Sequence, residues 1–238
     1  MISGQAPDWC RHAEAGGNTP LLSEWVSMRS QAHMTDTMPT TPPLSPPHFS
    51  VCVYCGARPG DDPLFADTAR QVGQWIGQHG GQLVYGGGSN GLMGIVADAT
   101  LAAGGRVVGI IPQALVDKEW AHARCTELHV VDTMHERKRM MAERADAFIA
   151  LPGGIGTFEE FFEVWTWRQL GYHNKPVGLL NLNGYYDGLL TFLSSVVGHE
   201  FMGAWQMDLI TVDTQAPALL KKLVQSAGLQ YDVQSAAL

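Results

Sequence analysis

Seven short apolar runs recur along the chain from residue 49 onward, and a longer stretch with helical periodicity separates most of them. They span residues 49–56, 82–87, 106–112, 127–131, 147–154, 176–182 and 209–213. Most of them show no alternation of apolar with polar residues, so they fit strands that are buried on both faces. Strands of this kind belong to parallel sheets covered by helices on either side. The pattern therefore predicts one α/β domain over residues 49–238, built on a doubly wound parallel sheet.

Residues 1–48 have a different composition. The stretch "TDTMPTTPPLSPPH" carries proline and threonine where a core would need apolar periodicity. We expect residues 1–48 to form a disordered or extended leader rich in proline and threonine. The methionines Met28, Met34 and Met38 also fit a start codon assigned too far upstream.

Charge and composition narrow the classes of function. The 238-residue chain has a formal net charge of −8, which argues against general attraction to nucleic acid or to an anionic membrane. No apolar run approaches the roughly 18 residues that a membrane span needs. No basic region followed by an apolar stretch marks a secretory signal. With four cysteines in the chain, we expect a cytoplasmic protein and no disulfide scaffold.

Cys52 and Cys55 form a CxxC pair inside the first strand-like run. Residues three apart in a strand point to opposite faces. No second cysteine pair completes a zinc site. We therefore favour structural cysteines over a redox or metal pair, and we expect no metal and no cofactor.

The first glycine-rich corner, "VYGGGSNGLMG", lies between a predicted strand and a predicted helix. Gly86, Gly88 and Gly91 match the G-x-G-x-x-G pattern, in which backbone N–H groups can approach an anion. A dinucleotide site would also need an acidic residue about 20 positions on, and that region reads "VVGIIPQ". The corner favours phosphate over NAD, while glycines used only for tight turning and close packing remain the alternative.

The second corner is "ALPGGIGTFEE", residues 150–160. Thr157 falls at or near a predicted helix N-cap with Glu160 three residues later, so one interpretation of the pair is a capping box. Glu159 and Glu160 lie about 100° apart on a helix, so one of them faces any cleft. Periodicity does not say which.

A basic run follows the predicted strand at 127–131. Arg137, Lys138 and Arg139 form the densest cluster of positive charge in an acidic chain. A solvated helix face is the usual fate of such a run. The run nevertheless begins at the carboxyl end of a strand, on the side of both glycine corners. His135 and Glu136 do not begin a zinc motif, because HExxH would need histidine where Arg139 stands.

Four ordered motifs resemble the LOG family over roughly residues 49–223: "VCVYCGARPG", "LVYGGGSNGLMG", "MHERKRMM" and "LPGGIGTFEEFFEVWTWRQLG". The resemblance implies a Rossmann-like domain that pairs into a homodimer, with active sites near the dimer interface. It also implies an enzyme, a cytokinin riboside 5′-monophosphate phosphoribohydrolase with related AMP nucleosidase activity. Such an enzyme cleaves the N-glycosidic bond of a nucleoside 5′-monophosphate, with or without an N6 substituent, to free base and ribose 5-phosphate.

The resemblance also implies particular site residues. The catalytic pair of the family matches Arg137 and Glu160. Its phosphate and nucleotide contacts match Gly86, Gly87, Gly88, Gly153, Gly154, Gly156 and Thr157, with Met134 and Lys138 nearby. This chain departs from the family near the first strand, where members often read Cys-Gly-Ser-Ser and Ala57 and Arg58 occupy the two serine positions.

Other functions remain open on the sequence. A nucleotide- or molybdenum-cofactor-binding carrier of the same fold, without hydrolase activity, is the main alternative, although it would not need the Arg137/Glu160 pair. A nicotinamide dehydrogenase would need a carboxylate to bind the ribose of NAD, and this chain has none at the expected position. Nothing in the sequence supports the Schiff-base lysine of a decarboxylase. The choice between AMP and N6-prenylated AMP is also open.

Overall fold

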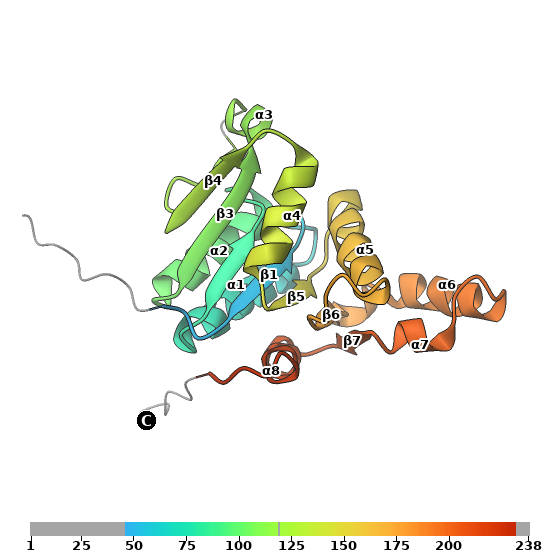
Figure 1. Ribbon diagram of the computed structural model, residues 1–238. Helices are drawn as coiled ribbons and strands as arrows, with labels where there is room; N and C mark the ends of the chain where they lie inside the picture. The colour runs from blue at the N-terminus through green and yellow to red at the C-terminus, as the bar shows by residue number, and fades with distance from the viewer. Residues whose placement is uncertain (1–45, 119, 232–238) are drawn as a thin grey trace, which may run out of the picture. The chain divides into compact units, whose positions relative to one another are not determined.

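The structure is a computed structural model that describes residues 46–118 and 120–231 (Figure 1). The strands are β1 (Ser50–Tyr54), β2 (Gln82–Tyr85), β3 (Arg106–Pro112), β4 (Glu127–Val131), β5 (Ala147–Ala150), β6 (Val177–Leu180) and β7 (Ile210–Asp213). The helices are α1 (Pro63–Gln78), α2 (Gly91–Ala102), α3 (Gln113–Val116), α4 (Met134–Arg144), α5 (Ile155–Gln169), α6 (Asp187–Gly198), α7 (Ala204–Met207) and α8 (Ala216–Ser226), with a 3₁₀ turn η1 (Leu182–Gly184) before α6. The predicted leader lies outside the described residues, apart from its last three.

The sheet is doubly wound. Its strands pair in parallel in the order β4-β3-β2-β1-β5-β6-β7. The chain builds outward from β1 to β4, returns to place β5 beside β1, and continues to β7 on the other side. The predicted α/β doubly wound, Rossmann-like fold is therefore confirmed. The winding reverses between β1 and β5, and ligands of such folds bind outside the carboxyl ends of the strands at this point.

Helices cover both faces of the central strands, which explains why these strands lack polar alternation, while the edge strands β4 and β7 are only partly buried. One face packs against α1, α2 and α8, and the other against α4, α5 and α6. Cys55 belongs to the first core and Cys52 to the second, as a side-chain period of two predicts. Burial raises the pKa of both thiols, and both are free. The structural interpretation of these two cysteines therefore fits the fold.

Two further observations concern the described residues alone. Among them, no helix combines the length and the apolar character that crossing a bilayer requires. Within residues 46–118 and 120–231, no three His, Cys, Asp or Glu side chains cluster in a way that would hold a metal ion.

Candidate active site

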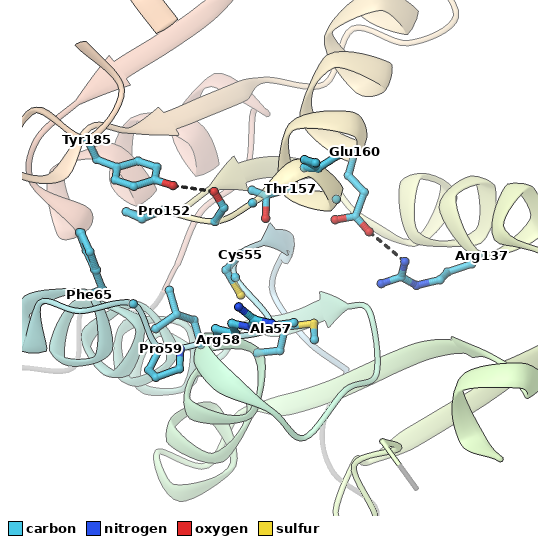
Figure 2. A pocket seen from close by; sticks show the side chains of 18 residues that line it. Cys55, Ala57, Arg58, Pro59, Phe65, Arg137, Pro152, Thr157, Glu160 and Tyr185 are labelled. Carbon is cyan, nitrogen blue, oxygen red and sulfur yellow. Dashed lines mark hydrogen bonds and ion pairs between the residues drawn. The ribbon is translucent and has the colours of Figure 1, made fainter. Parts of the chain in front are cut away.

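A cavity of about 660 Å³ opens where the winding of the sheet reverses (Figure 2). The loop after β1 forms one wall, and the loop after β5 together with the first turns of α5 forms another. The lining residues are Cys55, Gly56, Ala57, Arg58, Pro59, Gly60, Phe65, Leu92, Met93, Arg137, Pro152, Gly153, Gly154, Ile155, Gly156, Thr157, Glu160 and Tyr185. The topology thus brings together chain segments that lie about 100 residues apart.

Glycine allows the two loops to touch. The backbone N–H of Gly56 donates to the Pro152 carbonyl at 3.1 Å. A Cβ on Gly153 would lie 2.8 Å from the Gly56 nitrogen and would overlap the Thr157 hydroxyl. Because these atoms are backbone or a short side chain, they cannot move aside cheaply. A side chain at position 153 would therefore push the walls of the cavity apart.

The helix α5 begins earlier than the capping interpretation requires. Gly154 is its N-cap, in an extended conformation with φ −98° and ψ −156°, and no side chain caps the helix. Thr157 is the third residue inside the helix, so the capping box with Glu160 was wrong. The N–H groups of the first turn have no intrahelical partners, and Ile155, Gly156 and Thr157 line the cavity. This turn and the helix dipole offer the cavity an anion-binding edge.

Arg137 and Glu160 meet across the space between α4 and α5. The distance between Arg137 Nη1 and Glu160 Oε1 is 3.0 Å, and the two side chains are only 9% and 10% exposed. Arg137 Nε donates to the Ile110 carbonyl at 3.2 Å, which fixes the plane of the guanidinium. The structure therefore aims Glu160 at the cavity, while Glu159 points elsewhere.

The Glu160 carboxyl is set for proton chemistry. Burial raises its pKa above the ordinary value, and the positive charge of Arg137 offsets that rise only in part. The nearby carboxylates of Glu159 and Glu163 raise the pKa of Glu160 further, and Lys138 lowers it. A raised pKa brings a carboxylate closer to the range in which it can take up and release a proton at neutral pH.

The basic run divides into three environments. Arg137 enters the site. Lys138 is buried and holds Glu159 and Glu163 of α5, with its Nζ 3.1 Å from Glu163 Oε1, and it does not line the cavity. Arg139 pairs with Glu143 at the surface.

Met134 begins α4 and is largely exposed, and its sulfur lies 4.0 Å from Arg137 Nη1.

The first glycine corner packs against the Arg137 guanidinium. A Cβ on Gly86 would overlap Arg137 Nη2 and lie 3.0 Å from its Cζ. Gly87 takes a positive φ of 73°, and Gly88 pairs with Ala121 in an isolated bridge. Gly86, Gly87 and Gly88 do not line the cavity, so this structure gives them packing roles. Their predicted contact with phosphate stays a prediction.

The apolar part of the cavity includes two aromatic residues that lie outside the sequence motifs. Phe65 and Tyr185 meet edge to face with ring centroids 5.6 Å apart, and Tyr185 donates to the Gly153 carbonyl at 2.7 Å. Leu92 and Met93 come from the start of α2. Leu92 and Met93 end the first glycine motif, whereas no motif marks Phe65 or Tyr185, because Phe65 looks like an ordinary position of α1 and Tyr185 follows a 3₁₀ turn.

Fold and cavity together define a doubly wound α/β protein whose cavity at the topological switch point is lined by a buried arginine–glutamate pair and by the start of a helix. A family described as possible lysine decarboxylase matches residues 93–223. A probable cytokinin riboside 5′-monophosphate phosphoribohydrolase of Oryza sativa subsp. japonica is 48% identical over 175 residues, 74% of this chain and 78% of that protein. A cytokinin riboside 5′-monophosphate phosphoribohydrolase of Arabidopsis thaliana is 47% identical over 173 residues, 73% of this chain and 81% of that one. The chain belongs to the LOG family, as its four motifs predicted.

Solved structures support the fold. The Moco carrier protein from Chlamydomonas reinhardtii superposes with a TM-score of 0.57 at 20% identity, covering 75% of this chain and 97% of that one. The molybdenum cofactor binding protein from Rippkaea orientalis gives a TM-score of 0.54 at 20% identity, with 74% and 94% covered. At this identity the likeness concerns the fold alone.

Proposed function

We propose that this chain is a phosphoribohydrolase that cleaves the N-glycosidic bond of adenosine 5′-monophosphate or its N6-modified forms. The products are the free base, adenine or a cytokinin, and ribose 5-phosphate. One observation carries the proposal: the buried Arg137–Glu160 pair faces a cavity that also holds the uncapped N-terminus of α5. Membership of the LOG family supports the same chemistry.

The phosphate end of the substrate fits the start of α5. The first-turn N–H groups at Ile155, Gly156 and Thr157 can donate to phosphate oxygens, and the helix dipole favours the negative charge. Anchoring the phosphate there fixes the ribose against the next turn of the helix. Glu160 lies on that next turn, so the anchor positions the sugar beside the carboxylate.

The reaction follows the logic of glycoside hydrolysis. As the bond from C1′ to the base breaks, the base leaves with the electron pair and positive charge builds on the ribose. The Glu160 carboxylate stabilises this charge and takes a proton from the water that attacks C1′. The departing base takes a proton from solvent, and Glu160 afterwards releases its proton to solvent, so the reaction consumes one water and balances without a cofactor. Arg137 holds Glu160 in place, and its remaining N–H donors can bind ribose or phosphate oxygens.

We further propose a homodimer with the cavity near its interface, acting in the cytoplasm on a small nucleotide rather than on nucleic acid or a membrane. The net charge of −8 supports a small-molecule substrate held by local donors over a general polyanion surface.

A base-release assay tests the proposed function. The protein is incubated with AMP, N6-isopentenyl-AMP and the two matching ribosides, and free base is followed by chromatography. We expect base from the monophosphates and far less from the ribosides, and the ratio of the two monophosphate rates identifies the preferred base. Absence of base from both monophosphates, together with a pterin or molybdenum that co-purifies, would replace this proposal with the carrier function.

A further inference from the structure

One positive charge in the cavity has no counter-ion among the residues that the structure describes. Among the lining residues, Arg58, Arg137 and Glu160 are the charged ones, and the last two pair with each other. Arg58 is exposed and makes no hydrogen bond or ion pair with any of the residues that the structure describes.

The backbone that carries Arg58 is tightly held. Gly91 takes a positive φ of 57°, and a Cβ there would overlap the Arg58 nitrogen. A Cβ on Gly56 would lie 2.9 Å from the Arg58 carbonyl oxygen. Leu92 N–H donates to the Gly56 carbonyl at 3.0 Å, which ties the loop to the start of α2. The backbone at Arg58 is therefore fixed by packing, while its guanidinium has no partner within residues 46–118 and 120–231.

The charge of the substrate calls for such a group. A phosphate monoester carries a charge of about −1.5 to −2 at neutral pH. The N-terminus of α5 offers roughly half a positive charge. The charge of Arg137 is already matched by Glu160 at 3.0 Å. Within the described lining, Arg58 is thus the remaining whole positive charge that can balance the phosphate.

We propose that Arg58 binds the 5′-phosphate of the substrate and makes this chain select monophosphates over ribosides. Figure 2 places Arg58 on the other side of the cavity from Thr157, so the two would hold the phosphate from opposite walls. The planar guanidinium can donate two parallel hydrogen bonds to phosphate oxygens. This proposal rests on the proposed function, because it assigns a role within the same substrate cavity.

The test compares Arg58→Ala and Arg58→Lys with the unmodified full chain. The matched control is Arg70→Ala, since Arg70 is also an exposed arginine but pairs with Asp67 on α1, away from the cavity. Thermal unfolding of each variant confirms that it is folded. Titration calorimetry then measures binding of ribose 5-phosphate and of ribose, and the base-release assay measures kcat/KM for AMP and for adenosine.

We expect Arg58→Ala to bind ribose 5-phosphate about 10- to 100-fold more weakly, the loss typical of a hydrogen bond between charged groups. The kcat/KM for AMP falls by the same factor through KM, while that for adenosine stays unchanged. Arg58→Lys keeps part of the affinity, because a point charge replaces the fork. Unchanged binding of ribose 5-phosphate, or an equal loss for AMP and adenosine, would overturn the role of Arg58.

The two proposals fail in different ways. A chain that binds ribose 5-phosphate through Arg58 but releases no base refutes the hydrolase and keeps the phosphate contact. A chain that releases base equally well with Arg58→Ala keeps the hydrolase and refutes the contact.

Discussion

Replacing Glu160 with glutamine removes one negative charge from the cavity and preserves the size of the side chain. The carboxylate is the group that takes the proton from water and stabilises charge on the ribose. Proton transfer by a positioned side chain contributes about 10²- to 10⁴-fold to a rate. We therefore expect Glu160→Gln to lower kcat by about 100- to 10,000-fold, with little change in KM because the phosphate anchor is untouched.

The same substitution should change the free energy of unfolding in a definite direction. Burial raises the folded-state pKa of Glu160, and this net shift already includes the opposing attraction of Arg137. A raised carboxyl pKa means that stability is fully present below the unfolded pKa, about 4.3, and is lost as pH rises through the folded pKa. At pH 7 the native protein is therefore destabilised by the ionised, buried Glu160 carboxylate, and the Glu160→Gln variant is not.

The size of this effect follows from the pKa shift. Each pKa unit corresponds to about 1.4 kcal/mol, or roughly 3–6 °C in Tm for a domain of this length. Glu160→Gln should thus raise Tm at pH 7 or leave it unchanged, and the difference should vanish near pH 4. Differential scanning fluorimetry at both pH values measures it.

The neighbouring residue Glu159 provides a matched control. Glu159→Gln alters a half-exposed carboxylate that pairs with Lys138, outside the cavity lining. Because the removed charge is half-exposed and screened, this variant should keep base release within about fivefold of the native rate. The reasoning is refuted if Glu160→Gln retains more than about a tenth of the native kcat. It is equally refuted if the variant loses more than about 5 °C in Tm at pH 7.

Three further predictions concern the neighbours of the pair. Arg137→Met should move the acid limb of the kcat/KM profile to higher pH, because Arg137 holds the pKa of Glu160 down; an unmoved limb in a pH–rate profile would contradict this. Gly153→Ala should lower the free energy of unfolding by at least about 2 kcal/mol and remove most activity, because its Cβ would overlap Thr157. Gly156→Ala has open space around its Cβ and should unfold at the native temperature. Equal unfolding curves for the two variants would refute the packing argument. Gly86→Ala should displace the Arg137 guanidinium and lower kcat by about tenfold or more, and a native kcat would show that the glycine has no such role.

Much of the fold can be predicted from the sequence, because buried strands leave recognisable runs of apolar residues. Apolar runs with little alternation predict a parallel sheet, because helices cover the central strands on both faces. A period of two alone places Cys52 and Cys55 in different cores. The glycine corners identify the loops at the carboxyl ends of strands, and four ordered motifs identify the family.

Only the tertiary structure decided which side chains share the cavity. Helical spacing leaves Glu159 and Glu160 equivalent, and the packing of α4 on α5 gives Glu160 to Arg137 and Glu159 to Lys138. The capping interpretation of Thr157 was wrong, because α5 has its N-cap at Gly154, three residues earlier. The spacing of Thr157 and Glu160 does not show where the backbone becomes helical. Phe65, Tyr185 and Arg58 come together because the sheet reverses its winding between β1 and β5. Local sequence encodes the strands, whereas the contacts across that reversal are non-local and exist only once the sheet has formed.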